Sequence, residues 1–377
     1  MSDNLNSIKS FKDKKIAPDL IKQFTKQLKG KVDEIKEIQE TYKLIHKLSL
    51  AKKFKVEKKL VHRTLFNSET LPMLGNEYWW FLFIGQTGEK PIQLMFLIFR
   101  KHGKDMLFNG KKMQLQRISK NKFKGVTACW VWDGKKLREL GDTNAITTID
   151  SKKRILKSVI SEHKVTLKGS FPKFEFNVGD VINLKTFDLK RAINKDAAGV
   201  YLPPFGMGWV DAFSKTKGTV FGKEFDGIGH LQKVVGITTS GCFNWGNIFF
   251  KSGSSFSFFG VRPEKKLKNM FHTYVSFYNH KTNKVLLFKK PKLAIVKKGT
   301  KNPEWVVSGS DKNNGFKIHL KTYMKKKFKF EGGGWQVYEE YGVSVKKLNL
   351  TINGNKILLK DLGKGIGTFE DAYGFVI

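Results

Sequence analysis

The stretch KFEFNVGDVINLKTF, at residues 173–187, decides the fold class. Its two halves, Lys173–Val178 and Val181–Phe187, are short runs rich in aromatic and β-branched residues, which is the composition of β-strands. The Gly179-Asp180 dipeptide between them is typical of a tight turn. Two strands joined by so short a turn pair antiparallel, so this stretch predicts a β-hairpin.

Similar runs lie upstream of this hairpin. QLMFLIFR at 93–100 and VTACWVW at 126–132 have the same strand composition, and the turn dipeptide Asp133-Gly134 follows the second run at once. No long helical period interrupts the series. The pattern therefore argues against a parallel βαβ sheet and favours antiparallel barrels or sandwiches.

A second series of strand-like runs begins near Gly241. Within it, Asn353-Gly354 separates two apolar runs and is a strong hairpin signal. The length of 377 residues also suits two domains of ordinary size. We therefore expect an all-β protein with two tandem antiparallel β-barrels, the first at residues 60–238 and the second at 239–377.

Residues 1–59 have a different pattern. A polar, lysine-rich tail is followed by Pro18-Asp19, which suits the first turn of a helix. Apolar side chains then recur at steps of three and four residues as far as about Leu48, which predicts an added N-terminal amphipathic helix. Three roles are open for it: packing on its own chain, a coiled coil in a homodimer, and a lid facing lipid. The stripe comprises Ile21, Phe24, Leu28, Ile35, Ile38, Tyr42 and Ile45.

The chain carries 70 basic and 33 acidic residues, a net charge of +37. Only seven of the basic residues are arginine, although specific recognition of phosphates and bases favours the bidentate arginine side chain. We therefore expect no specific nucleic-acid partner. Two interpretations of the charge are open: a solvated lysine-rich surface, and docking of that surface on an anionic membrane face.

Cys129 and Cys242 form neither a C-x-x-C pair nor a dense disulfide framework, which favours a reducing cytoplasm, with a peripheral membrane position left open. The eight histidines are scattered without metal-ligand spacing. Phosphate-loop, nucleophile-elbow and dinucleotide-binding motifs are missing from the sequence. We expect no metal and no cofactor.

Four short segments stand out by their tryptophan and glycine content. They are EYWWF at 77–81, GIGHLQK at 227–233, FNWG at 243–246 with Gly253-Ser254 after it, and GIGTFEDAYG at 365–374. In this order they resemble the family of two-lipocalin-domain proteins that includes carotenoid 1,2-hydratase (hydroxyneurosporene synthase). The resemblance implies lipocalin-like barrels whose aromatic walls hold an apolar, isoprenoid- or carotenoid-like small molecule.

The resemblance also implies a chemistry. An enzyme of this kind is a hydro-lyase or cyclase that protonates an isoprenoid double bond and stabilises the resulting cation with aromatic faces. We expect His230, Glu370 and Glu77 to be the catalytic acids and bases, with Asp226 or Glu77 as the partner of His230. Further candidates are Tyr338, Glu339, Glu340 and Asp371. The expected ligand-binding residues are Trp79, Trp80, Trp245, Tyr338, Gln232 and Lys233.

The chain departs from the family within residues 227–233. His230, Gln232 and Lys233 take the places of a tyrosine, an aspartate and a histidine. Because glutamine cannot donate a proton as an acid, a second function stays open, that of a non-catalytic carrier of an apolar ligand. Nucleic-acid binding is a third function, and it rests on charge alone.

Overall fold

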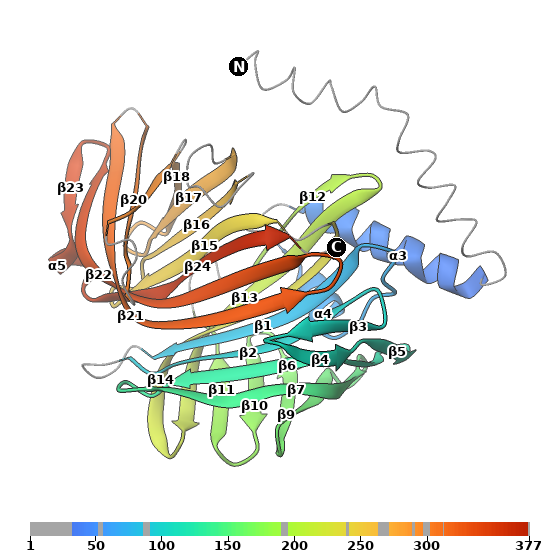
Figure 1. The fold of residues 1–377 in the computed structure, drawn as a ribbon. Coiled ribbons are helices and arrows are strands. Elements are labelled where there is room, and N and C mark those ends of the chain that lie inside the picture. Colours follow the sequence, from blue (N-terminus) through green and yellow to red (C-terminus); the bar gives the residue numbers. More distant parts are fainter. Residues whose placement is uncertain are drawn as a thin grey trace.

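A computed structural model describes residues 32–51, 56–85, 91–189, 195–238, 241–262, 271–288, 291–296, 302–311 and 313–375. Their strands form two antiparallel sheets, which we name sheet A and sheet B. Figure 1 shows sheet B lying over one side of sheet A, with the long helix α3 (Val32–Ser49) at the edge of the molecule. The prediction of an all-β antiparallel protein is confirmed.

Sheet A has twelve strands, ten of which form a closed barrel. Its strands are β1 Gly75–Gly85, β2 Gln93–Lys101, β5 Gln116–Ser119, β6 Lys122–Trp132, β7 Leu137–Asp150, β8 Ile155–Ile160, β9 His163–Ser170, β10 Lys173–Val178, β11 Ile182–Phe187, β12 Lys195–Leu202, β13 Phe205–Val220 and β14 Lys223–Ile237. The barrel order is β11-β10-β9-β8-β7-β6-β2-β1-β14-β13, and β13 pairs with β11 to close it, while β5 and β12 attach outside. The predicted hairpin at 173–187 is confirmed as β10 and β11.

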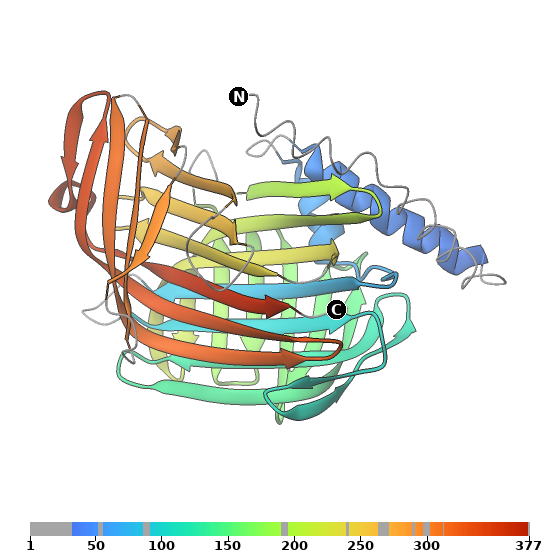
Figure 2. The same ribbon diagram turned by 45° about the horizontal axis from the view of Figure 1, so that its top comes forward.

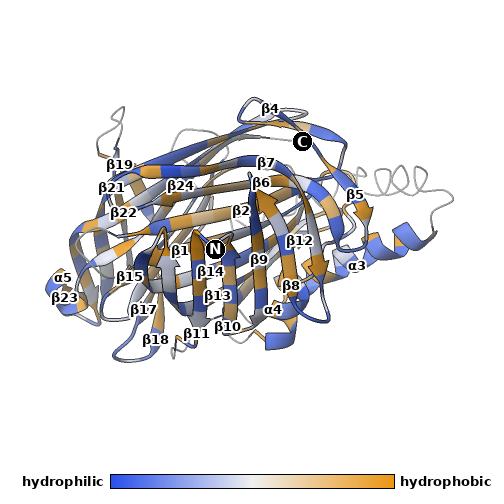
Figure 3. Ribbon diagram, turned by 90° about the horizontal axis from the view of Figure 1, so that it is seen from below, coloured by the Kyte–Doolittle hydropathy of each residue, from blue (hydrophilic) through white to orange (hydrophobic). Residues whose placement is uncertain are grey.

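Alternate residues of these strands point into the barrel and fill it. The rings of Phe81 and Phe83 pack on Phe176 with centroids 5.9 and 5.1 Å apart, and Phe96 and Phe123 are also fully buried. Figure 3 shows the matching alternation of hydrophobic and hydrophilic residues along the strands seen from below. The interior of the barrel is therefore occupied by its own side chains.

A short helix, α4 (Lys58–Leu65), extends this core at one end of the barrel. Its buried side chains Leu60, Val61 and Leu65 belong to the apolar cluster of the barrel interior. Trp79 Nε1 donates a hydrogen bond of 2.8 Å to the Leu65 carbonyl. No sequence pattern predicts this helix, because eight residues give too few turns for a helical period to show.

Helix α3 packs against β12 and β13, and its Leu44, Ile45 and Leu48 belong to the same apolar cluster as the barrel interior. A Cβ atom added to Gly206 would lie 2.9 Å from Ile45, and one added to Gly208 would lie 2.8 Å from Leu48, so glycines at these positions let the helix approach the strand. The stripe from Ile38 to Leu48 is thus buried on its own chain, while residues 18–31 of the predicted helix lie outside the described residues. None of the described helices is long and apolar enough to cross a membrane.

Sheet B contains most of the second half of the chain, with β14 ending sheet A at Ile237. Its elements are β3 Asp105–Phe108, β4 Lys111–Gln114, β15 Cys242–Phe250, β16 Ser255–Arg262, β17 Phe271–Asn279, β18 Lys284–Phe288, β19 Lys292–Ile295, β20 Glu304–Asp311, β21 Asn314–Glu331, β22 Trp335–Ile352, β23 Asn355–Leu358 and β24 Gly365–Phe375, with the helical turn α5 Leu359–Leu362. The main order is β18-β17-β16-β15-β24-β22-β21-β20-β19.

The prediction of a second closed barrel is wrong for the described strands. Sheet B curls over at one end of the molecule (Figure 2). It encloses an apolar cluster of its own, in which the rings of Phe288 and Phe316 lie 4.6 Å apart. Its edge strands β18 and β19 do not pair with one another. They are only five and four residues long, which leaves little backbone to form a closing ladder.

The two sheets meet across a shared apolar layer. The outer faces of β1, β2 and β6 contribute Trp80, Leu97 and Trp130, and sheet B contributes Phe249 and Phe328. The β3–β4 hairpin belongs to the first half of the chain but pairs with β21 of sheet B. This layer, and not the filled interior of the barrel, is where polar side chains from both sheets meet.

Candidate functional site

Two buried carboxyl groups face the shared layer from sheet B. Glu340 on β22 and Glu370 on β24 are directly opposite each other in the antiparallel register, and only 0% and 4% of their surfaces are exposed. Residues in such positions have Cβ atoms about 4.5–5.5 Å apart. Because both carboxyl groups are buried and lie this close together, ionising both would cost a large free energy.

Burial, together with the charge of Glu370, raises the pKa of Glu340 well above its usual range. The pKa of Glu370 is raised to about 8, mainly by burial; the hydrogen bond with the Tyr338 hydroxyl lowers it and the Asp211 charge raises it. Trp130 Nε1 donates to Glu340 Oε2 at 3.2 Å. The pair therefore retains a proton at neutral pH and can act as a general acid.

A histidine–aspartate pair faces the same layer from the barrel. His230 on β14 lies 2.6 Å from Asp211 on β13, measured between Nε2 and Oδ1, and both residues are buried. Gln232 Nε2 donates to the same carboxylate oxygen at 2.8 Å. Asp211 thereby fixes the orientation of the imidazole, as a proton-accepting histidine requires.

Aromatic rings enclose this histidine. Phe213 stacks on His230 with centroids 4.4 Å apart, Trp245 stacks on it at 5.5 Å, and Trp80 meets it edge-on at 5.3 Å. Trp245 is also directly opposite Glu370 in the register of β15 and β24. Trp245 of sheet B thus contacts the His230 imidazole of sheet A and neighbours the carboxyl pair of its own sheet.

Several polar atoms of this layer are buried without a hydrogen-bond partner among the described residues. They are Trp80 Nε1, His230 Nδ1 and Glu340 Oε1. Leaving a buried donor or acceptor unpaired costs about 1–3 kcal/mol, and three such atoms from three strands of both sheets is an unusual concentration. Proteins keep such unpaired polar groups mainly at sites where the groups bind a ligand or take part in a reaction.

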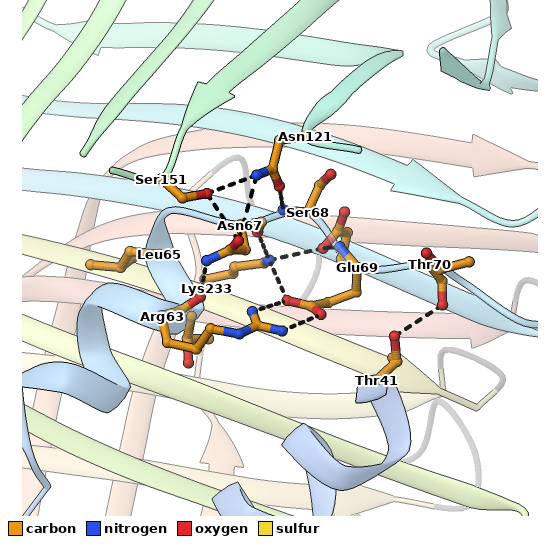
Figure 4. A network of polar contacts seen from close by, with 12 residues as sticks. Thr41, Arg63, Leu65, Asn67, Ser68, Glu69, Thr70, Asn121, Ser151 and Lys233 are labelled. Atoms are coloured by element: carbon orange, nitrogen blue, oxygen red, sulfur yellow. Dashed lines mark hydrogen bonds and ion pairs between the residues drawn. The ribbon is translucent and has the colours of Figure 1, made fainter. Parts of the chain in front are cut away.

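The remaining predicted site residues lie elsewhere, inside the barrel. Lys233 Nζ lies 2.9 Å from Glu77 Oε2 and 4.2 Å from the Trp79 ring centroid. Arg100 Nε donates to Glu77 Oε1 at 2.7 Å. Glu69 joins the same network, and Figure 4 shows it between Lys233 and Arg63. These charges compensate one another, which is the arrangement of a structural ion-pair network.

Strand alternation explains this division. Trp79 and Lys233 point into the barrel, whereas their chain neighbours Trp80 and Gln232 point outward into the layer. Six predicted residues therefore come together in the layer: His230, Glu370, Trp80, Trp245, Tyr338 and Gln232. The other three, Glu77, Trp79 and Lys233, lie in the barrel.

Sequence reasoning missed one central residue. The partner of His230 is Asp211, and the predictions of Asp226 and Glu77 for that role are wrong: Asp226 lies 3.5 Å from Lys217, and Glu77 is in the barrel network. Asp211 lies 19 positions before His230, so only the pairing of β13 with β14 brings them together. Glu340 was one of the further candidates named from the sequence.

No protein-family model and no curated protein matches the sequence, so the resemblance to the carotenoid 1,2-hydratase family has no support from a family-level match. Among solved structures the chain is similar to one described as AttH of Nitrosomonas europaea, with a TM-score of 0.43 and 11% identity over 78% of this chain and 92% of that chain. CghA with Sch210972 gives a TM-score of 0.45 and 8% identity, over 79% and 88%. CghA alone gives 0.43 and 8%, over 80% and 88%. These likenesses are distant and say nothing about function.

Proposed function

We propose that this protein binds an apolar, unsaturated small molecule in the layer between the barrel and sheet B and protonates it. The observation that carries the proposal is the pair of buried carboxyl groups, Glu340 and Glu370, which retain a proton at neutral pH beside aromatic rings and a histidine–aspartate pair. The proposed activity is hydration or cyclisation of an isoprenoid-like double bond, as the sequence resemblance implies.

In the proposed reaction, the protonated Glu370 carboxyl group transfers its proton to one alkene carbon, and a carbocation forms at the other. The faces of Trp80 and Trp245 stabilise that cation. A water molecule adds to it while the His230–Asp211 pair accepts a proton from the water. In cyclisation, a second double bond of the same molecule adds instead and closes a ring, and the His230–Asp211 pair removes a proton from the carbon next to the new cation, which leaves a double bond. Proton exchange with solvent restores the acid and the base, so hydration consumes one water.

The alternative function is that of a carrier, which binds the same class of ligand without changing it. It also uses the aromatic walls of the layer but needs no proton transfer. The two functions make different predictions for exchange between solvent and substrate carbon.

The test is an incubation with geranylgeraniol, an acyclic isoprenoid alcohol, in D₂O. Carbon protonation introduces deuterium into the recovered lipid or product whether hydration or cyclisation follows, and mass spectrometry detects it. Quenching of tryptophan fluorescence measures binding of the same probe. We expect wild-type protein to bind and to incorporate deuterium.

Glu370→Gln should abolish incorporation and retain binding, because glutamine keeps the shape of the side chain without the transferable proton. Glu224→Gln, on an exposed part of β14, is the matched control and should behave as wild type. Binding without incorporation in the wild type establishes the carrier. If geranylgeraniol and related polyenes do not bind, both functions are overturned.

A further inference from the structure

A basic pocket with a volume of about 510 Å³ opens on the solvent side of α4, at the end of the barrel. The helix presents Lys58, Lys59, His62 and Arg63 to it, while its opposite face is buried in the barrel core. These four residues are two pairs spaced four apart, so they share one face of the helix. The apolar face of α4 packs on the barrel interior, so the pocket on its opposite face lies away from the shared layer.

The lining of this pocket contains no carboxylate. Arg63 is paired with Glu69 by two hydrogen bonds of 2.6 and 2.9 Å. Lys58, Lys59 and Arg154 have no acidic partner in the part of the chain that the structure describes. Three uncompensated cations around one concave surface give it a strong positive potential.

Arg154 is held in an unusual conformation. Its φ of 55° lies in the left-handed region that non-glycine residues rarely adopt. Its Nε is buried, with no hydrogen-bond partner among the described residues. A guanidinium that lines a pocket without a carboxylate beside it is suited to bind an anion.

His62 adds a neutral donor. Its Nε2 accepts the backbone N–H of Phe171 at 2.9 Å, which leaves the ring proton on Nδ1. Burial and the charges of Arg154, Lys58 and Lys195 lower the pKa of His62 to about 4. The three cations that act on this imidazole come from different elements, so the positive potential belongs to the pocket as a whole.

The floor of the pocket is rigid. Asn121 Nδ2 donates to Ser151 Oγ at 2.7 Å, and Ser151 Oγ donates to Asn67 Oδ1 at 2.9 Å (Figure 4). These bonds join the chain that leaves α4 to the β7–β8 turn, which carries Arg154. The cations therefore project from a fixed frame and need little ordering on binding.

We propose that this pocket binds a phosphate group, either as a free phosphate or pyrophosphate ion or as the headgroup of a phosphatidic-acid-type lipid. A multiply charged oxyanion matches three uncompensated cations and the donors of Arg154 and His62 better than a single carboxylate does. The inference is independent of the acid–base site in the shared layer.

The test compares two double variants of equal charge. Lys58→Gln with Arg154→Asn removes two pocket cations, and asparagine tolerates the left-handed backbone at position 154. Lys152→Gln with Lys153→Gln removes two exposed lysines from the same β7–β8 turn that do not line the pocket. Binding of pyrophosphate is measured by calorimetry at constant ionic strength, and binding of vesicles with or without phosphatidic acid by cosedimentation.

We expect the wild type and the Lys152/Lys153 variant to bind pyrophosphate alike, and the Lys58/Arg154 variant to bind it at least tenfold more weakly. Vesicle binding that is lost in the same variant identifies a lipid headgroup as a source, whereas pyrophosphate binding alone identifies a soluble anion. Equal weakening in both variants would mean general attraction to a basic surface and overturns the proposal. So does the absence of binding to either probe in the wild type.

Discussion

Glu77 and Glu40 each form an ion pair of the same length with a basic side chain, but only Glu77 is buried. Arg100 lies 2.7 Å from Glu77, which is fully buried, and Lys43 lies 2.7 Å from Glu40, whose side chain is 62% exposed. Removing one carboxylate from a buried network leaves its cations uncompensated, here Arg100 and Lys233. An exposed pair is screened by water and contributes little.

We therefore expect Glu77→Gln to lower the free energy of unfolding by about 3–5 kcal/mol. The same substitution at Glu40 should change it by less than about 0.5 kcal/mol. Urea denaturation at pH 7 measures both. If Glu77→Gln lowers the free energy of unfolding no more than Glu40→Gln does, the Glu77 network does not stabilise the barrel.

The pH dependence of stability tests the carboxyl pair of the shared layer. Burial raises the pKa of Glu370 from its ordinary value of 4.5 to about 8. Between these values the folded protein holds a proton that the unfolded chain releases, so this contribution is complete below about pH 4.5 and is lost as the pH rises to 8. We expect stability to fall by up to about 5 kcal/mol over that range for this reason.

Glu370→Gln should make this pH profile flatter, because the raised carboxyl is gone and Glu340 loses its charged neighbour. The measurement is urea denaturation at several pH values between 5 and 8. Glu224→Gln, which changes an exposed carboxylate, should keep the slope of the wild type. An unchanged slope in Glu370→Gln would contradict the protonated pair.

At the scale of elements, α4 couples the barrel core to the basic pocket. Leu65 is fully buried among barrel side chains, while Lys59 is exposed on the opposite face. Leu65→Ala removes buried methyl groups and leaves a cavity, so we expect a loss of about 2–5 kcal/mol in the free energy of unfolding. Lys59→Ala should stay within about 0.5 kcal/mol of the wild type. A small effect of Leu65→Ala in urea denaturation would mean that α4 does not stabilise the barrel.

Local patterns predicted the elements that depend on neighbours in sequence. The hairpin of β10 and β11 and the helix up to Leu48 follow from alternation, turn residues and a helical period. Closure of a sheet depends instead on pairing between distant strands, which is why the open edges of sheet B were not predicted.

The candidate site divides in the same way. His230 and Glu370 were found because they lie in segments with a recognisable local composition. Asp211 was not found, because its role comes from the register of β13 with β14. Trp79 and Trp80 are adjacent in sequence, and only knowledge of which face of β1 points into the barrel separates them.

At the scale of the whole molecule, the two sheets share one apolar layer and are linked by the β3–β4 hairpin. Phe108 of this hairpin pairs with Phe330 of β21, and their rings lie 5.0 Å apart. Separate domains joined by a small interface unfold independently, but here neither sheet can lose its partner without exposing the layer. The chain should therefore unfold as a single cooperative unit.

We expect coincident urea transitions by tryptophan fluorescence and by far-ultraviolet circular dichroism. Phe108→Ala should destabilise the whole chain by about 3–5 kcal/mol and leave one transition, because Phe108 is fully buried between the sheets. Leu107→Ala is the control, since Leu107 is its neighbour on the same strand and is 39% exposed. Two separate transitions in the wild type, or a Phe108→Ala protein in which only part of the signal shifts, would show that the sheets fold independently.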